Sequence, residues 1–141
     1  MKLNILIFFI FSTISSMAQN TLADPPLEFA FEVTCTLDPP QELGITSYGK
    51  RRIIPITGGT FTGPNIKGII LPGGADWQTV RTDGTADLEA RYTLKTDDGA
   101  LIYINNKGIR TGKPEVLARL GKGEKVYPTE YYMRAAATFE V

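Results

Sequence analysis

The side chains of this chain that could take part in chemistry are carboxylates, tyrosines, lysines and arginines. The 141 residues include 15 Lys and Arg, 15 Asp and Glu and 6 Tyr, but no His and only 1 Cys. A chain without histidine cannot build a His-ligated zinc site, a Ser-His-Asp triad or a histidine general base. Any reaction would have to use carboxylates, tyrosines, lysines or arginines, or a metal ion held by oxygen ligands. Our prediction is a site without a metal or a cofactor.

The first candidate is an acid beside the only tryptophan. Asp76 and Trp77 follow the glycine pair Gly73-Gly74. The carboxylate could act as a general base or hydrogen-bond acceptor at the mouth of a pocket, with the indole ring stacking on a ligand. The alternative is structural: Asp76 caps its own turn and Trp77 closes one end of a barrel. The sequence favours the structural interpretation and leaves the functional one open.

A second candidate lies on an alternating segment. Residues 86–96 place Asp87, Glu89, Arg91 and Thr93 on one side of a strand, and Leu88, Ala90, Tyr92 and Leu94 on the other. If the polar side lines a barrel, Glu89 and Arg91 form a buried charged pair that could anchor a carbonyl or carboxylate ligand. If that side points outward, both are ordinary surface charges. Alternation alone does not decide between these orientations.

The last candidate pair is Tyr132 and Arg134, which are two residues apart and share one face of the final predicted strand. Arginine and tyrosine together suit recognition of an oxyanion or a carboxylate. Tyr132 could equally be a core residue, and Arg134 could pair with a nearby acid. We predict a ligand-binding site from these three segments, with at least four of six residues bordering one cavity: Asp76, Trp77, Glu89, Arg91, Tyr132 and Arg134.

The elements that must position these side chains are β-strands, because period-two alternation and turn dipeptides recur along the chain. Proline ends the first strand at 38–40, and glycine-containing turns are predicted at sites that include 58–59, 83–84, 97–99 and 105–108. The one helical candidate runs from Pro114 to Leu120. Predicted strands cover 27–37, 51–57, 60–62, 66–71, 77–82, 86–96, 101–104 and 129–141. Sheets of this size curl or close, because open edges invite aggregation. The prediction is an all-β, antiparallel barrel with one short helix.

The first 18 residues are typical of a signal peptide. Lys2 supplies a positive charge, an apolar run covers 5–14, and Ser16-Met17-Ala18 fits the small-residue rule for cleavage after Ala18. The run is too short for a membrane span, which needs about 20 apolar residues. We expect an exported protein, periplasmic or secreted, without stable membrane insertion. Its expected organisation is a signal peptide (1–18), a linker (19–26) and a single β-barrel domain (27–141).

Composition also bears on partners and redox chemistry. Acidic and basic residues balance, so the chain lacks the basic footprint that nucleic-acid binding requires, and we expect no nucleic-acid partner. The only basic cluster, Lys50-Arg51-Arg52, is interpreted as a solvated loop. Cys35 alternates with apolar residues and is expected to be a small core residue rather than a reactive thiol.

Six spaced motifs occur in order along residues 27–141. They are Gly58-Gly59-Thr60-Phe61-x-Gly63-Pro64, Leu71-Pro72-Gly73-Gly74-Ala75-Asp76-Trp77, Ala90-Arg91-Tyr92, Asp98-Gly99-Ala100-Leu101-Ile102, Gly108-x-Arg110 and Tyr131-Tyr132-Met133-Arg134. Together they resemble domain-of-unknown-function family 3237. The resemblance implies a lipocalin-like (calycin-like) barrel with a central cavity, but no settled reaction. Similar proteins run further, through an aromatic, Leu-Asn-Arg-like strand. Either this sequence is truncated or the chain lacks the last strand or two of the family, and we expect an incompletely closed barrel.

These observations leave alternative functions open. The first is a barrel that binds a small, partly hydrophobic molecule in its central cavity. The second is a cofactor-independent lyase, isomerase or hydrolase acting on a carbonyl-bearing small molecule, with Asp76 or Glu89 as base and Arg91 or Arg134 polarising oxygen. A third is an extracytoplasmic interaction protein that uses the barrel as a scaffold. A carboxylate inside the cavity near a tyrosine or arginine would favour the enzyme, and an apolar lumen would favour plain binding.

Overall fold

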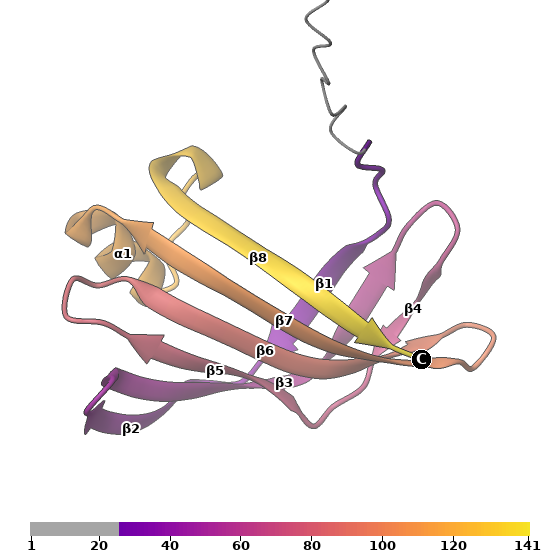
Figure 1. The fold of residues 1–141 in the computed structure, drawn as a ribbon, viewed down its shortest axis with the longest axis horizontal. Helices are drawn as coiled ribbons and strands as arrows, with labels where there is room; N and C mark the ends of the chain where they lie inside the picture. The colour runs from indigo at the N-terminus through magenta and orange to yellow at the C-terminus, as the bar shows by residue number, and fades with distance from the viewer. Residues whose placement is uncertain (1–25) are drawn as a thin grey trace, which may run out of the picture.

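Residues 26–141 form an antiparallel sheet of eight strands in the computed structural model of the protein (Figure 1). The strands are β1 (Glu32–Leu37), β2 (Gln41–Thr46), β3 (Gly49–Thr62), β4 (Lys67–Ile70), β5 (Gly74–Val80), β6 (Ala86–Thr96), β7 (Leu101–Gly112) and β8 (Tyr131–Glu140). Between β7 and β8 lie the helix α1 (Pro114–Gly121) and the short helical turn η1 (Pro128–Glu130). This confirms the prediction of a mostly β protein with one short helix.

The described residues leave out part of what the sequence predicts. The expected signal peptide and its cleavage site after Ala18 lie outside residues 26–141, as does nearly all of the expected linker. Within residues 26–141, no helix is long and apolar enough to cross a membrane.

The longest strand, β3, organises the sheet. Along one edge it pairs with β1 and β2, and along the other with β4 and β5. Gly58 and Gly59, inside this strand, have φ angles of 150° and 136°, which other residues rarely adopt. A Cβ atom at Gly59 would lie 2.0 Å from the carbonyl oxygen of Thr34 in β1. The glycine pair therefore lets β3 continue as one strand while β1 packs closely against it.

Several predictions about individual elements are wrong. The Gly58-Gly59 pair is not a turn, because the pairing of β3 with β1 and β4 continues past it. Residues 105–108 are not a turn either: they pair with β6 on one side and β8 on the other, and β7 extends to Gly112. The Lys50-Arg51-Arg52 cluster lies in β3 rather than in a loop, and β2, absent from the prediction, pairs with that part of β3. The first strand begins at Glu32, not at Leu27.

The sheet curls into a ring whose end strands are β1 and β8. The pairing runs β1-β3-β4-β6-β7-β8, with β2 beside β3 and β5 between β3 and β6. Among residues 26–141, β1 and β8 are not paired with each other. Phe31, just before β1, nevertheless packs edge-on against Phe61 of β3 at 5.7 Å and against Phe139 of β8 at 6.1 Å between ring centres. The curl therefore brings the two ends of the sheet into aromatic contact at one corner.

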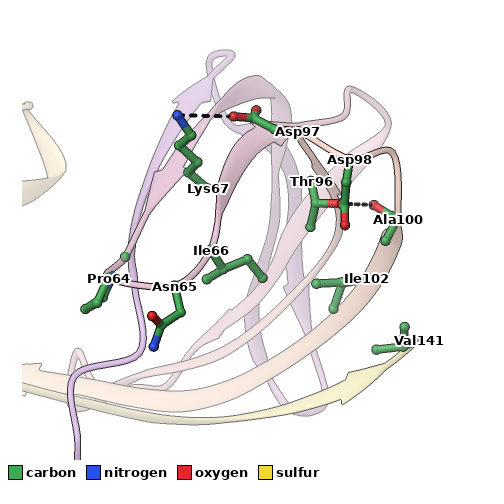
Figure 2. Close-up of a pocket in the computed structure, with 11 residues that line it drawn as sticks. Pro64, Asn65, Ile66, Lys67, Thr96, Asp97, Asp98, Ala100, Ile102 and Val141 are labelled. Carbon is green, nitrogen blue, oxygen red and sulfur yellow. Dashed lines mark hydrogen bonds and ion pairs between the residues drawn. The ribbon is translucent and has the colours of Figure 1, made fainter.

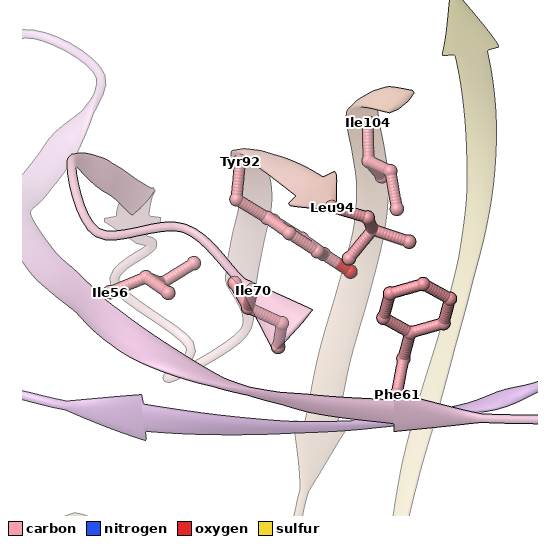
Figure 3. Close-up of a cluster of buried hydrophobic side chains, with 6 residues drawn as sticks. All are labelled: Ile56, Phe61, Ile70, Tyr92, Leu94 and Ile104. Carbon is pink, nitrogen blue, oxygen red and sulfur yellow. The ribbon is translucent and has the colours of Figure 1, made fainter. Parts of the chain in front are cut away.

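Alternation along the strands gives the sheet two faces. We call the side that carries the hydrophobic core the inner face, and the opposite side the outer face. The core is a cluster of six buried side chains contributed by four strands and drawn in Figure 3: Ile56, Phe61, Ile70, Tyr92, Leu94 and Ile104. Cys35 is half-buried and packs against this cluster, as its alternation predicts, and burial raises the pKa of its thiol. Burying each such apolar side chain contributes roughly 1.5–3 kcal/mol.

The helix α1 covers the end of the sheet at which β7 stops. Pro114 occupies its first turn, where a missing N–H costs nothing, and Val116 is buried. Leu117 lies against two glycine positions, Gly84 in the β5–β6 turn and Gly112 at the end of β7. The following segment is held by Arg119, which forms an ion pair with Glu130 at 3.0 Å. The sheet is thus covered at one end by α1, whereas the turns 63–66 and 97–100 lie at the other (Figure 1).

Candidate functional site

The inner face carries the apolar core along one part of its length and several polar side chains nearer to α1. On β6 and β7 the paired residues Tyr92 and Ile104 belong to the apolar core, while Ala86 pairs with Arg110 nearer to α1. On β3 the inner positions likewise change from Ile56 and Ile54 to Arg52, and β5 places Asp76 and Gln78 opposite Ile54 and Arg52. We call four inner-face residues there the inner polar cluster: Arg52, Asp76, Gln78 and Arg110.

Three members of the inner polar cluster form a hydrogen-bonded chain. Arg52 of β3 donates through Nε to Oε1 of Gln78 at 2.8 Å, and Gln78 donates through Nε2 to Oδ2 of Asp76 at 2.5 Å. Gln78 is only 3% exposed, so its side chain is fixed in place. Asp76 also accepts a hydrogen bond through Oδ1 from the backbone N–H of Glu89 at 3.0 Å, which anchors its carboxylate to β6. The acid predicted beside Trp77 is therefore held rigidly on the inner face.

Arg110, the fourth member, lacks a comparable partner. Its Nε is one of two buried side-chain polar atoms without a hydrogen bond among residues 26–141; the other, Oδ1 of Asn105, lies on the outer face. Burial, reinforced by the nearby positive charge of Arg52, lowers the pKa of the Arg110 guanidinium, and the charge of Asp76 opposes this shift. Arg110 therefore lies within electrostatic range of both other charged members of the cluster.

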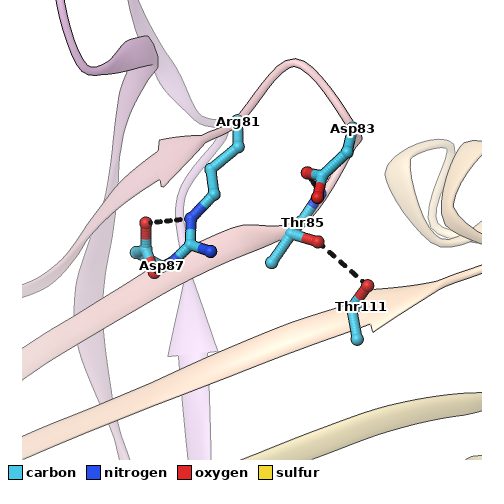
Figure 4. Close-up of polar contacts among 5 residues, drawn as sticks. All are labelled: Arg81, Asp83, Thr85, Asp87 and Thr111. Carbon is cyan, nitrogen blue, oxygen red and sulfur yellow. Dashed lines mark hydrogen bonds and ion pairs between the residues drawn. The ribbon is translucent and has the colours of Figure 1, made fainter.

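The turn beside Arg110 is fixed by its own polar contacts (Figure 4). Arg81 binds Asp87 through two hydrogen bonds of 2.8 and 2.5 Å across the β5–β6 turn. The hydroxyl groups of Thr85 and Thr111 lie 2.9 Å apart and join this turn to β7 one residue after Arg110. These contacts fix the β5–β6 turn and join it to the part of β7 that carries Arg110.

The inner face is open on its β8 side. Met133, Ala135 and Ala137 of β8 are the inner-face partners of Arg110, Gly108 and Asn106, respectively. All three β8 residues are exposed, and Met133 retains 44% of its accessible surface. The inner face beside Arg110 is therefore not covered by these β8 side chains.

Trp77, Glu89 and Arg91 lie together on the outer face, so the outward orientation of the polar side of β6 is the observed one. The Arg91 guanidinium stands over the Trp77 ring at 5.6 Å from its centre. Glu89 binds Arg91 at 2.6 Å and Lys107 at 3.4 Å, and the Arg91 hydrogen bond lowers the pKa of Glu89. Two pockets of about 290 and 350 Å³ adjoin Trp77, one bordered by Arg91 and the other by Glu89.

Tyr132 and Arg134 also lie on the outer face, but apart from Trp77. Both are exposed on β8, with the Arg134 guanidinium 5.4 Å from the centre of the Tyr132 ring. Two strands, β6 and β7, separate them from β5. Of the six predicted ligand-binding residues, the structure brings Trp77, Glu89 and Arg91 together, places Tyr132 and Arg134 elsewhere on that face, and turns Asp76 to the inner face.

A further pocket, of about 600 Å³, opens at the end of the sheet opposite α1 (Figure 2). The β3–β4 and β6–β7 turns line it, together with Ile102 and Val141. Its polar groups bind one another: Lys67 pairs with Asp97 at 3.5 Å, and the Thr96 hydroxyl donates to Asp98. The arrangement stabilises the turns and does not concentrate groups with open hydrogen-bonding capacity, in contrast to the inner polar cluster.

The six predicted ligand-binding residues do not include Arg52, Gln78 or Arg110, although Arg110 belongs to the motif Gly108-x-Arg110. The interpretation of Lys50-Arg51-Arg52 as a loop excludes Arg52, although alternation with Ile54 and Ile56 places it on the core side of a strand. The predicted turn at 105–108 separates Arg110 from the strand that carries it. Continuing the alternation of Ile102 and Ile104 through that segment would have put Arg110 on the inner face.

The comparison with protein families matches residues 25–141 to the family described as "Protein of unknown function (DUF3237)". The chain belongs to this family. A relative from Rhodopseudomonas palustris, named as a UPF0311 protein, is 43% identical over 118 residues, covering 82% of this chain and 77% of the relative. Its crystal structure, described as a conserved protein of unknown function, has a TM-score of 0.78 over 83% of this chain and 78% of that one.

Two further structures extend the comparison. One from Acinetobacter baumannii, described as a beta-barrel like protein, is 49% identical with a TM-score of 0.65, covering 84% of this chain and 78% of that one. The other is an enzyme from Penicillium herquei, 28% identical with a TM-score of 0.53 over 63% of this chain and 72% of that one. A hydroalkoxylation enzyme of the same fungus is 34% identical over 80 residues, which cover 57% of this chain and 53% of the enzyme. The ring-shaped sheet is therefore shared with DUF3237 proteins and with a more distant enzyme.

Proposed function

We propose that this DUF3237 protein binds a small, partly hydrophobic molecule on its inner face. The observation that carries the proposal is the Arg110 guanidinium, whose buried Nε has no hydrogen-bond partner beside the charges of Arg52 and Asp76. Buried polar groups are almost always paired, and an exception calls for an explanation such as a missing ligand. Ligand sites also tend to combine an apolar surface with a few convergent polar groups, as the core and the inner polar cluster do here.

The molecule would lie with its apolar part against the core side of the inner face and its oxygen atoms towards the inner polar cluster. Ala90, which pairs with Asp76 across the sheet, and the exposed Met133 and Ala135 of β8 offer apolar surface near the cluster. Arg110 and Arg52 offer N–H donors that suit a carbonyl, a carboxylate or a phenolic oxygen. The ligand would reach the inner face from the β8 side, where Met133, Ala135 and Ala137 are exposed.

Native mass spectrometry of the protein purified from its source tests this proposal directly. The expected result is a small molecule that stays bound under gentle ionisation and leaves on unfolding. It should be lost from the Arg110→Met variant and retained by Arg91→Met, which removes a guanidinium from the outer face of the same sheet. A protein that retains nothing, and that a library of small apolar acids, phenols and ketones fails to stabilise, would contradict the proposal.

A second candidate function is cofactor-independent catalysis at the same site. It is favoured by the similarity to an enzyme that the name of the Penicillium protein describes as a hydroalkoxylation enzyme. That reaction adds a hydroxyl group across a carbon–carbon double bond and, within one molecule, is an isomerisation, which is among the reaction types expected from the sequence. Asp76 would accept the hydroxyl proton while the oxygen bonds to one alkene carbon, and would then return the proton to the other alkene carbon, so that no atom is gained or lost. Arg110 would stabilise the oxygen on which negative charge develops.

A phenol that carries a neighbouring alkenyl group serves as the substrate for testing this second function. Wild-type protein should convert it to the cyclic ether, and Asp76→Asn should reduce the rate about a hundredfold or more, as expected for loss of a general base. Glu89→Gln, which removes an outer-face carboxylate, should leave the rate unchanged. Equal rates for wild type and Asp76→Asn would exclude Asp76 as the base.

We also propose that the protein is exported, on the sequence of residues 1–18 alone. N-terminal sequencing of protein from the extracytoplasmic fraction should begin at Gln19. A chain that begins at Met1 in that fraction would refute cleavage after Ala18.

A further inference from the structure

The charges of the inner polar cluster do not balance. The cluster contains two guanidinium groups, Arg52 and Arg110, and one carboxylate, Asp76. None of the ion pairs formed among residues 26–141 involves any of these three side chains. Both carboxylate oxygens of Asp76 already accept hydrogen bonds from neutral groups, the amide of Gln78 and the backbone N–H of Glu89. The cluster therefore carries one positive charge in excess.

No neighbouring acid is free to supply the missing negative charge. Glu42 of β2 is the register partner of Arg52, but it binds Lys50 at 2.9 Å. On the other strands beside the cluster, Glu89 and Asp87 point to the outer face, where they bind Arg91 and Arg81. Glu130, beyond α1, is bound to Arg119. The partial burial of Arg110 makes this excess costly, because a guanidinium away from water needs a counter-charge or hydrogen-bond acceptors.

We propose that the inner-face site selects a monoanionic ligand, an apolar ring or chain that carries one carboxylate or other planar oxyanion. This inference rests on the proposed binding function and adds the charge of the ligand to it. The oxyanion would accept hydrogen bonds from the partly buried Arg110 guanidinium and from the remaining N–H groups of Arg52, whose Nε already donates to Gln78. Guanidinium groups suit planar oxyanions because their N–H donors lie in one plane.

The same arrangement discriminates against other ligand charges. A neutral amide of the same shape would leave the excess charge in place, and an ammonium group would add a second one. Asp76 limits the preference to one negative charge, because a dianion would bring a surplus charge close to the carboxylate. Asp76 thus sets the charge of the preferred ligand, whereas Arg110 and Arg52 contact it.

Isothermal titration with two ligands of one shape tests this inference. Biphenyl carboxylate should bind wild-type protein about tenfold or more tightly than the uncharged biphenyl carboxamide, because a hydrogen bond to a charged group is worth considerably more than one between neutral groups. In Arg110→Met the difference between the two ligands should shrink to about threefold or less, whereas Arg91→Met should keep it. Asp76→Asn, which raises the excess positive charge, should widen it.

The outcomes separate the inference from the function on which it rests. Equal binding of the carboxylate and the carboxamide, with both bound, overturns the selection of an anion and leaves small-molecule binding intact. Binding of neither compound, together with no binding by the wider library of apolar acids, phenols and ketones, overturns both. A preference for the carboxylate that persists in Arg110→Met and disappears in Arg91→Met would overturn the inner-face assignment, because it would place the anion on the outer face.

Discussion

Arg52 and Arg110 carry the same charge on the same face of one sheet, but their hydrogen bonding differs. The Nε of Arg52 donates a hydrogen bond to Oε1 of the buried Gln78 at 2.8 Å, whereas the buried Nε of Arg110 has no acceptor. Removing a donor that has a buried partner leaves that partner unsatisfied, and removing a donor without one does not. The two residues should therefore contribute to stability in opposite ways, although both are expected to serve ligand binding.

Urea unfolding of the ligand-free protein measures this difference. Arg52→Met should lower the free energy of unfolding by about 1–3 kcal/mol, because Oε1 of Gln78 loses its partner. Arg110→Met should leave it unchanged or raise it by about 1 kcal/mol, because the variant no longer buries an unpaired N–H. A loss in Arg110→Met as large as that in Arg52→Met would mean that Arg110 has a structural partner, and would remove the main reason for assigning it to a ligand.

At the scale of the elements, the packing of β1 on β3 requires glycine at position 59. Gly59→Ala places a Cβ atom against the backbone of β1 at a φ of 136°. The expected cost is about 3 kcal/mol, from backbone strain and overpacking together. Gly121→Ala, at the end of α1 with open space around it, should change the free energy of unfolding by less than about 1 kcal/mol. Thermal unfolding of both variants checks the contrast, and similar midpoints would show that β1 does not pack on Gly59.

This glycine also shows what the sequence could and could not predict about the elements. Alternation correctly places β6 at 86–96, because each apolar residue there faces the core. A glycine pair occurs both where the chain reverses and where two strands approach closely, so the sequence alone does not distinguish a turn at Gly58-Gly59 from a close approach. The difference lies in the contact with Thr34, which is distant in sequence. In the same way, the sequence does not show that β7 continues through residues 105–108 to Arg110.

The candidate site was predictable only in part. Asp76 is identified by its motif, but the faces of the strands follow from where the core forms. Trp77, beside Asp76 in sequence, lies on the opposite face, because neighbouring residues of a strand alternate. Glu89 and Arg91 pair with each other as expected, yet on the outer face. A local pattern therefore reveals which residues share a face, and only the whole fold reveals which face is inside.

At the scale of the whole molecule, a buried tyrosine of the core makes the free energy of unfolding decrease at alkaline pH. Burial, assisted by the nearby Cys35, raises the pKa of Tyr92 from its ordinary value of 10.0 to about 12. The unfolded chain therefore loses this proton before the folded one does, so stability is complete below about pH 10 and falls as the pH rises towards 12. Tyr92→Phe should reduce this fall by up to about 2 kcal/mol, whereas Tyr127→Phe, at an exposed tyrosine, should retain it. The urea midpoint of unfolding, measured at several pH values in this range, checks the prediction. A midpoint that falls as steeply in Tyr92→Phe as in the wild type would contradict it.

The central claim is that the inner face of the ring, rather than the pockets around Trp77, receives the ligand. Alanine methyl groups mark both faces: Ala90, Ala135 and Ala137 lie on the inner face, and Ala75 and Ala136 on the outer face. The most direct measurement is nuclear magnetic resonance of the alanine methyl groups during titration with biphenyl carboxylate. The signals of the three inner methyl groups should shift while those of Ala75 and Ala136 stay in place. Shifts confined to Ala75 and Ala136 would contradict the claim and place the ligand on the outer face.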